Sequence, residues 1–250
     1  MIIIPMAGIS SRFFKAGYKK PKYMLEAHGK TLFYHSVNSF SAYFNSTPFL
    51  FIVRDFFDTA AFVKQSAKKM GIKEFYIVVL DQETRGQAET VALGLAGLSE
   101  QGLDYKGEIT IFNIDTFRQN FTFPLVENME AGYLEVFQGG GDNWSFAKPK
   151  DSNSTKVIET AEKNPISDLC STGLYHFTKT SHYLDAYNNY LSKPLTEWER
   201  GELYIAPLYN YLIKKGLGIH YHLIDRNDVI FCGIPNEYID FLQRCDPYEN

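Results

Sequence analysis

Short apolar runs alternate with segments of helical period through the first half of the chain. Four runs rich in β-branched and aromatic residues indicate buried strands, at residues 1–5, 48–53, 74–79 and 108–113. Between these runs, apolar residues recur at the spacing of amphipathic helices, in residues 31–42, 55–70 and 85–98. This alternation predicts an α/β fold with a mainly parallel sheet flanked by helices.

The third helical segment shows the clearest period. Its apolar residues fall on one face of a helix, namely Ala88, Val91, Ala92, Leu95 and Leu98. We expect this face to pack on the sheet, which leaves the amino-terminal end of the helix free to face a ligand.

The second half is richer in strand-like runs, at residues 132–137, 144–148, 156–160, 170–177 and 218–224, with helical segments at 179–191, 204–214 and 235–243. This pattern predicts that antiparallel strands extend the first sheet. Since no repeat, low-complexity segment or flexible linker divides the halves, we expect one domain, 1–250, in which residues 1–120 and 121–250 form two halves of one sheet.

The composition of the chain excludes some kinds of binding partner. The 25 basic and 29 acidic residues give a net charge of −4, which offers no electrostatic footprint for nucleic acid or an anionic membrane. No apolar stretch approaches the roughly 20 residues that span a bilayer, and the apolar start lacks the layout of a signal peptide. Cys170, Cys232 and Cys245 form no CxxC pair, and the first two lie in apolar runs that suggest burial. We therefore expect a reduced, cytoplasmic protein.

The strongest chemical signal is the string AGISSRFFKAGYKKPK, residues 7–22, which follows the first strand. Ligands of open α/β sheets bind beyond the carboxyl ends of strands, where the backbone N–H groups of a small-residue loop can face an anion. Arg12 and Lys22 add fixed positive charge to this loop. A surface loop with solvated basic residues is the plain alternative, but the strand, the small-residue loop and the two basic residues together favour a phosphate site. The string contains neither a Walker loop nor a GxGxxG dinucleotide fingerprint.

This loop resembles the pyrophosphorylase signature of the sugar nucleotidyltransferase family: a small glycine-containing loop, then arginine, then Pro-Lys about nine residues on. Further strings similar to that family follow in the same order and cover nearly the whole chain: TRGQAETVALGL (84–95), IFNIDTF (111–117), TAEKNPISDLCSTGLYHF (160–177), GELYIAPLYN (201–210) and FCGIPNEYIDFL (231–242). The resemblance implies a Rossmann-like, GT-A-like nucleotidyltransferase fold with an antiparallel acceptor-side extension.

The resemblance also implies roles for individual residues. It assigns residues 1–120 to the nucleotide and residues 121–250 to the acceptor, with Asp115 as the ligand of a Mg²⁺ cofactor and Arg12, Lys22 and Asp115 as the catalytic set. The implied nucleotide contacts are Ala7, Gly8, Ser10, Ser11, Arg12, Lys22, Thr84, Gly86, Gln87, Thr90 and Asp115. The implied acceptor contacts are Lys163, Ser171, Thr172, Gly173 and Glu202.

The chain departs from the family pattern at two positions. Ser10 stands where the family commonly has a second loop glycine, so the loop is less free to adopt positive φ, although the hydroxyl can donate a hydrogen bond. Phe231 stands where many members carry an aspartate that is the second Mg²⁺ ligand. Glu202 and Asp228 are open substitutes for it, and each has the plain alternative of a solvated acid.

Within the family, strings such as YKKPKYMLEAHGK and DNWSFAKP are most similar to a capsule-biosynthesis branch. That branch implies CTP and L-glutamine phosphate as substrates and CDP-L-glutamine as product, on the route to capsular phosphoramidate modification. Three alternatives stay open: a nucleotidylyltransferase that uses a sugar-1-phosphate with CTP, UTP or dTTP, a glycosyltransferase of similar build, and a non-catalytic nucleotide-binding regulatory relative. The implied partners are small molecules. The sequence does not determine the oligomeric state, for which a homodimer is one option.

Overall fold

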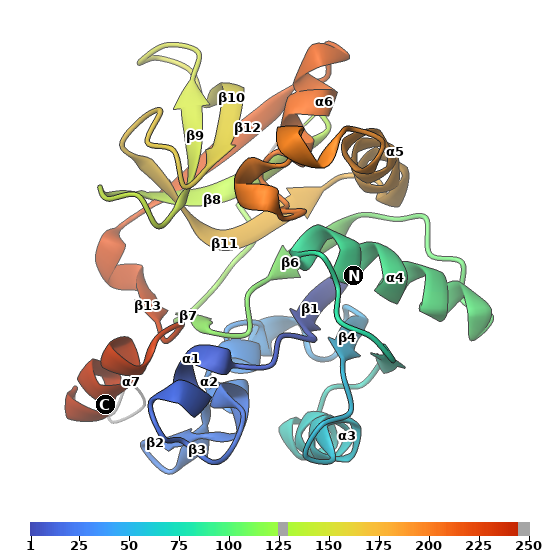
Figure 1. Cartoon of the computed structure of the whole chain (residues 1–250), viewed down its shortest axis with the longest axis vertical. Helices are drawn as coiled ribbons and strands as arrows, with labels where there is room; N and C mark the ends of the chain where they lie inside the picture. Colours follow the sequence, from blue (N-terminus) through green and yellow to red (C-terminus); the bar gives the residue numbers. More distant parts are fainter. Residues whose placement is uncertain (125–129, 245–250) are drawn as a thin grey trace.

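A nine-stranded sheet runs through the computed structural model, which describes residues 1–124 and 130–244 (Figure 1). The strand order is β5-β4-β1-β6-β11-β8-β12-β10-β9, so both halves of the chain contribute to one sheet. The first four strands pair in parallel, as the sequence predicts: β1 (Ile2–Met6), β4 (Phe49–Val53), β5 (Phe75–Val79) and β6 (Ile109–Phe112). Their uninterrupted apolar runs fit this position, because such a sheet is buried on both faces.

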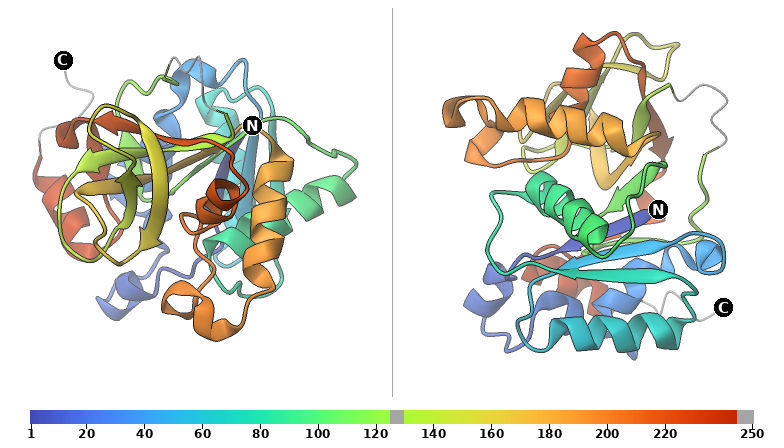
Figure 2. Two further views of the ribbon diagram at one scale, coloured as in Figure 1. Left: turned by 90° about the horizontal axis from the view of Figure 1, so that it is seen from above. Right: turned by 90° about the vertical axis from the view of Figure 1, so that its right-hand side faces the viewer.

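Helices cover both faces of the parallel part (Figure 2). On one face, α4 (Gln87–Glu100) packs against residues such as Ile3 and Ile52, and α5 (Thr180–Leu191) and α6 (Leu208–Lys214) join the same core. On the other face, α2 (Leu32–Asn38) and α3 (Thr59–Met70) cover Ile2 and Ile4. The expected apolar face of α4 is confirmed, since Ala88, Val91, Ala92, Leu95 and Leu98 all lie in this core.

Five strands of the second half form a closed ring of hydrogen-bonded pairs. They are β11 (Leu169–Phe177), β8 (Gly132–Gln138), β12 (Ile219–Ile224), β10 (Lys156–Glu162) and β9 (Ser145–Pro149). The ring closes because β9 also pairs with β11, at Cys170 and Phe146. All its pairs are antiparallel except β8–β12, which is parallel, so the expected antiparallel extension holds with one exception.

A two-stranded sheet that the sequence does not predict lies beside the parallel strands. It consists of β7 (Thr116–Arg118) and β13 (Val229–Phe231), each too short to show a period of its own. The pairing sets residues 231–237, including the start of α7 (Pro235–Gln243), beside Asp115. A second small hairpin joins β2 (Glu26–Ala27) to β3 (Lys30–Thr31) after the short helix α1 (Ser11–Lys15).

Three helices begin or end away from their predicted bounds. The helix predicted at 31–42 stops at Asn38, because the backbone of Phe40 leaves helical geometry and its ring packs on Phe112 and Phe121. The helix predicted at 55–70 begins only at Thr59, after two residues with positive φ. The helix predicted at 204–214 begins only at Leu208, because residues 203–206 instead run past the start of α4.

The described residues contain no helix long and apolar enough to cross a membrane. Cys170 and Cys232 are both buried and unpaired, as their apolar surroundings in the sequence suggest. Cys245 lies outside the described residues.

Candidate active site

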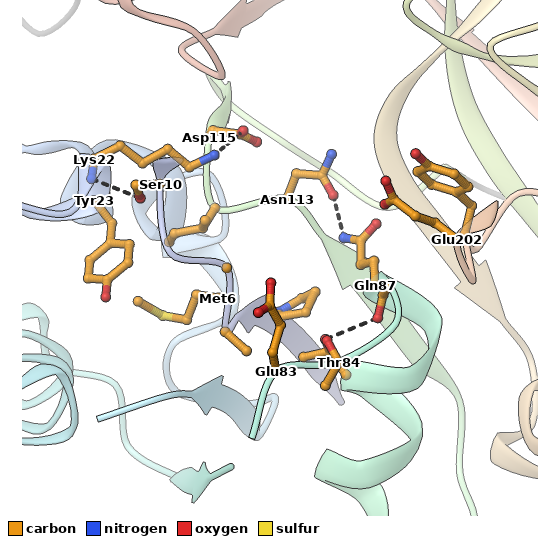
Figure 3. Close-up of a pocket in the computed structure, with 17 residues that line it drawn as sticks. Met6, Ser10, Lys22, Tyr23, Glu83, Thr84, Gln87, Asn113, Asp115 and Glu202 are labelled. Carbon is orange, nitrogen blue, oxygen red and sulfur yellow. Dashed lines mark hydrogen bonds and ion pairs between the residues drawn. The ribbon is translucent and has the colours of Figure 1, made fainter. Parts of the chain in front are cut away.

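Two cavities adjoin at the carboxyl ends of the parallel strands. The first, of about 430 Å³, is lined by the loop after β1 and the start of α4 (Figure 3). The second, of about 530 Å³, lies toward β9, β10 and β11. Both are lined by the same four residues at their junction, Gln87, Asn113, Asp115 and Tyr204. Two molecules could therefore occupy separate cavities and still meet beside Asp115.

The loop after β1 forms one wall of the first cavity. Ala7, Gly8 and Ser10 line it, while Ser11 begins α1 beyond the lining. Ser10 adopts φ 54°, the left-handed conformation that a glycine would take there with less strain. Its hydroxyl accepts a hydrogen bond from the backbone N–H of Lys22 at 3.2 Å, which ties the two ends of the basic loop together.

Lys22 and Asp115 meet at the junction of the cavities. The ammonium of Lys22 lies 2.5 Å from Asp115 Oδ2, and both side chains are about one-fifth exposed (Figure 3). Arg12, by contrast, lines only the second cavity, and its side chain has no hydrogen-bond or ion-pair partner within residues 1–124 and 130–244. The ammonium of Lys22 is thus paired with a carboxylate, whereas the guanidinium of Arg12 can bind an anion.

The segment at the start of α4 is held in place by close backbone contacts. Gly86 has φ 149°, and a Cβ there would lie 2.5 Å from the carbonyl oxygen of Leu203. That carbonyl accepts from the N–H of Ala88 at 2.9 Å, and the N–H of Leu203 donates to Arg85 at the same distance. These two hydrogen bonds hold the start of α4 against Leu203, and we call them the clamp. Glycine is required at position 86, because any side chain there would break the clamp.

Side chains of the same segment face the first cavity. The hydroxyls of Thr84 and Thr90 lie 2.7 Å apart, and Gln87 Nε2 donates to Asn113 Oδ1 at 2.6 Å (Figure 3). This pairing leaves the carbonyl oxygen of Gln87 and the amide nitrogen of Asn113 without a partner in the described residues, so one acceptor and one donor remain for a ligand.

The strand β11 is irregular where it lines the second cavity. Its pairing with β8 shifts between Ser171 and Tyr175, and Gly173 adopts φ 90° within that shift. A Cβ on Gly173 would lie 2.3 Å from the amide nitrogen of Asn113, so glycine is needed for Asn113 to reach the junction. Ser171 and Thr172 line the same wall, and Thr172 donates to the buried carboxylate of Glu135 at 3.0 Å.

Lys163 lies in the second cavity with its ammonium on Tyr204. Lys163 Nζ donates to the Tyr204 hydroxyl at 2.5 Å and lies 4.6 Å from the centre of the ring. Burial, followed by the nearby charge of Glu202, raises the pKa of Tyr204, so this phenol stays neutral at physiological pH. Beside it, burial raises the pKa of Glu162, which accepts a hydrogen bond from the hydroxyl of Ser145.

Phe231, in the place of the family aspartate, belongs to an aromatic wall. Its ring lies 4.7 Å from Trp144 and 5.6 Å from Phe137, centre to centre, at the edge of the second cavity. Of the two substitutes considered from the sequence, Glu202 lines the first cavity rather than the second, and Asp228 lines neither.

Several residues of this site do not stand out in the sequence. Tyr204 falls inside a family-like string, but its expected place in a helix hides its contact with Lys163. Asn113 and Glu162 lie in the family-like strings IFNIDTF and TAEKNPISDLCSTGLYHF, two residues from Asp115 and one from Lys163, but the resemblance assigned neither a contact of its own.

Comparison with known proteins identifies the family. No protein-family model matches the chain, and no curated protein matches it either. The crystal structure of a nucleoside-diphosphate-sugar pyrophosphorylase from Vibrio cholerae RC9 does match, with 71% sequence identity and a TM-score of 0.95, over 98% of this chain and 100% of that one. The chain belongs to the nucleoside-diphosphate-sugar pyrophosphorylase family. It is accordingly an enzyme of the nucleotidyltransferase class.

More distant pyrophosphorylase and nucleotidyltransferase structures share the fold. An inositol-1-phosphate CTP transferase from T. maritima has a TM-score of 0.69 at 12% identity, covering 96% of this chain and 93% of that one. A UDP-glucose pyrophosphorylase complexed with UDP-glucose has a TM-score of 0.70 at 13% identity, covering 96% of each chain. At such identities the likeness extends to the fold alone, which is the GT-A-like nucleotidyltransferase fold expected from the sequence.

Proposed function

We propose that this enzyme transfers a cytidylyl group from CTP to L-glutamine phosphate, forming CDP-L-glutamine and pyrophosphate for capsular phosphoramidate modification. The observation that carries the proposal is the pair of adjoining cavities, each with its own lysine, that share Asp115. Two phosphorylated substrates need such a layout, because their charges repel and must be brought together against that repulsion.

CTP is assigned to the first cavity. The backbone of Ala7 and Gly8, together with Thr84 and Gln87, offers donors and acceptors for the base. In this proposal Lys22, at the junction of the cavities, binds the α-phosphate, and Arg12, which lines only the second cavity, binds the outgoing phosphates. Ser10, Ser11, Gly86 and Thr90 complete the assigned nucleotide contacts.

The acceptor is assigned to the second cavity. We assign the acceptor phosphate to Lys163, because its hydrogen-bond partner Tyr204 is a neutral phenol that does not compensate the charge of the ammonium. Ser171, Thr172 and the backbone of Gly173 line the opposite wall. Asn143 and Glu162 add an amide and a carboxylate to the same cavity, which suits an acceptor that carries both an amide and an amino group.

The proposed reaction requires no protein nucleophile. A phosphate oxygen of the acceptor attacks the α-phosphorus of CTP, and the bond to the β-phosphate oxygen breaks on the opposite side, so that pyrophosphate leaves. Lys22 and Arg12 stabilise the negative charge that spreads over the phosphoryl oxygens in the transition state. Lys163 holds the attacking phosphate in line.

Asp115 is assigned to Mg²⁺. A carboxylate oxygen is the ligand that Mg²⁺ prefers in proteins, and the ammonium of Lys22 against Asp115 Oδ2 indicates that this oxygen attracts a cation. Bound there, Mg²⁺ would neutralise phosphate charge.

A sugar-1-phosphate is the second candidate acceptor, used with CTP, UTP or dTTP. The similarity to the Vibrio cholerae nucleoside-diphosphate-sugar pyrophosphorylase favours this candidate. The hydroxyls and carboxylates of the second cavity would also suit a sugar ring.

Pyrophosphate release with each NTP and a panel of acceptors tests the proposal. We expect CTP with L-glutamine phosphate to give the highest kcat/KM. If a sugar-1-phosphate gives the highest value, the glutamine assignment is wrong and the sugar candidate takes its place. If no pair releases pyrophosphate, nucleotidyl transfer itself is wrong.

A further inference from the structure

The aromatic wall of the second cavity offers an apolar surface to a bound molecule. Trp144 and Phe231 line this cavity with half-buried rings whose centres lie 4.7 Å apart, whereas most of the other lining side chains are polar or charged. The core behind the two rings consists of Phe137, Phe146 and Val229, which are all buried. The exposed part of the two rings is thus left to contact a ligand, as apolar surface in a binding cavity commonly does.

Contacts with neighbouring groups fix the wall in place. The indole N–H of Trp144 donates to the carbonyl of Gly140 at 3.2 Å, and its ring lies edge-on to Phe137 at 5.1 Å between centres. Arg226, which does not line the cavity, holds its guanidinium 4.9 Å from the centre of the Phe231 ring. Because its only polar atom is already hydrogen-bonded, Trp144 presents an apolar surface to a ligand.

Trp144 lies directly opposite Lys163 on the neighbouring strand. The backbone carbonyl of Trp144 accepts a hydrogen bond from the N–H of Lys163 at 2.8 Å, which continues the β9–β10 pairing one residue beyond Ser145 and Glu162. Trp144 and Lys163 both line the second cavity. A molecule whose phosphate binds Lys163 can therefore extend along the indole ring.

We propose that Trp144 and Phe231 bind the hydrocarbon part of the acceptor, and so select phosphorylated molecules that carry such a part beside the phosphate. This inference rests on the proposed function, since it takes the second cavity as the acceptor site. In L-glutamine phosphate the hydrocarbon part is the pair of side-chain methylene groups, and in a sugar-1-phosphate it is the C–H face of the ring. Phenylalanine suits this contact, whereas the aspartate that many family members carry at this position would have to give up its hydration for it.

The affinities for inorganic phosphate and butyl phosphate, measured by calorimetry without CTP or metal, test this inference apart from turnover. Both probes carry a phosphate for Lys163, but only butyl phosphate carries a hydrocarbon chain. We expect the wild type to bind butyl phosphate about tenfold more tightly, which is the gain that burial of about two methylene groups gives. Trp144→Ala should reduce this preference to less than about twofold and leave the affinity for inorganic phosphate within about twofold of the wild type, because Lys163 is intact.

Trp144→Phe is a second variant, in case the alanine variant folds poorly. It keeps a smaller ring, so we expect a preference between those of the wild type and Trp144→Ala. Fluorescence adds a direct readout, because the chain has two tryptophans and Trp198 lines neither cavity. In Trp198→Phe the indole emission comes from Trp144 alone, and butyl phosphate should move it to shorter wavelength while inorganic phosphate should not.

The inference is overturned if the wild type shows no preference for butyl phosphate, or if folded Trp144→Ala keeps that preference. If the preference behaves as expected but no acceptor yields pyrophosphate, the proposed function fails and the aromatic contact stands. If an acceptor does react and Trp144→Ala binds it as the wild type does, the inference fails and the proposed function stands.

Discussion

The two lysines of the site have different partners, and this difference decides how each can act. Lys22 is paired with the carboxylate of Asp115 at 2.5 Å, so its position is fixed before any substrate arrives. Lys163 lies on a neutral phenol, so its charge is not compensated by that partner. Substitution of Lys22 should therefore impair the chemical step, while substitution of Lys163 should impair acceptor binding.

Lys22→Ala and Arg12→Ala are each expected to lower turnover by at least about two orders of magnitude. Each change removes a charge that we assign to the phosphoryl oxygens of the transition state, and loss of such a charge typically costs that much. Steady-state pyrophosphate release measures the effect, and Lys20→Ala, an exposed lysine outside both cavities, is the matched control. Near-normal turnover in both folded variants would remove the loop from the catalytic site.

Lys163→Ala is expected to raise the KM for the acceptor or lower kcat, and to leave CTP affinity unchanged. The reason is that Lys163 lines only the second cavity. Such a one-sided effect separates an acceptor contact from a nucleotide contact. Calorimetric titration with CTP and initial rates at varied acceptor concentration measure the two parts. Weakened CTP binding with normal acceptor kinetics would contradict the assignment.

For single residues, the sequence predicted only those site residues that lie in recognisable local strings. The basic loop of residues 7–22 and Asp115 are each recognisable from a few neighbouring residues. Tyr204 is not, because its contact with Lys163 joins segments 41 residues apart in the chain and depends on the folded backbone. The position of Phe231 shows the same limit, because an aromatic wall with Trp144 and Phe137 lies where the family pattern implies an acid.

The elements differ in how far the sequence determines them. The buried strands were predicted to within one or two residues, because apolar runs bounded by polar residues mark them clearly. The short strands β7 and β13 were missed, as three residues are too few to show a period. The helix start predicted at Tyr204 was wrong because Leu203 is hydrogen-bonded to Arg85 and Ala88 at the start of α4, and the burial of Ile205 and Ala206 in the core adds to this tertiary constraint, which outweighs helical propensity there.

Gly86→Ala is expected to destabilise the enzyme and abolish nucleotide binding together. The added methyl would lie 2.5 Å from the backbone of Leu203, so the clamp between α4 and residues 203–206 must open. We expect a loss of about 2 kcal/mol or more in the free energy of unfolding, measured by urea denaturation. Gly140→Ala, whose methyl would meet nothing within 4 Å, should unfold like the wild type. Equal stability of the two variants would show that the clamp contributes nothing.

For the molecule as a whole, the seam between the two halves is the pairing of β6 with β11. His176 lies in this seam opposite Thr110, whose hydroxyl is 2.9 Å from the imidazole Nδ1. Burial lowers the pKa of His176 to about 4. The ring is therefore neutral in the folded enzyme, and the unfolded chain binds more protons than the folded chain between about pH 4 and the ordinary histidine pKa of about 6.5.

The free energy of unfolding should accordingly fall as the pH drops through this window, and His176 should account for about 2 kcal/mol of the loss between pH 6.5 and 4.5. Urea denaturation at these two pH values measures it. His176→Gln should show a smaller difference between them, while His182→Gln, a histidine on α5, should behave as the wild type does. Identical pH dependence in the wild type and His176→Gln would contradict this account of the seam.

The central claim for the whole molecule is that two phosphorylated substrates react where the cavities meet at Asp115. Phosphorus NMR of the enzyme with CTP, L-glutamine phosphate and Mg²⁺ tests this claim most directly, because it identifies the products. We predict two coupled diphosphate signals of a CDP-linked product, growing in equal amount with pyrophosphate and only when both substrates are present. Unchanged substrate signals, or CMP and pyrophosphate from hydrolysis of CTP alone, would contradict the claim.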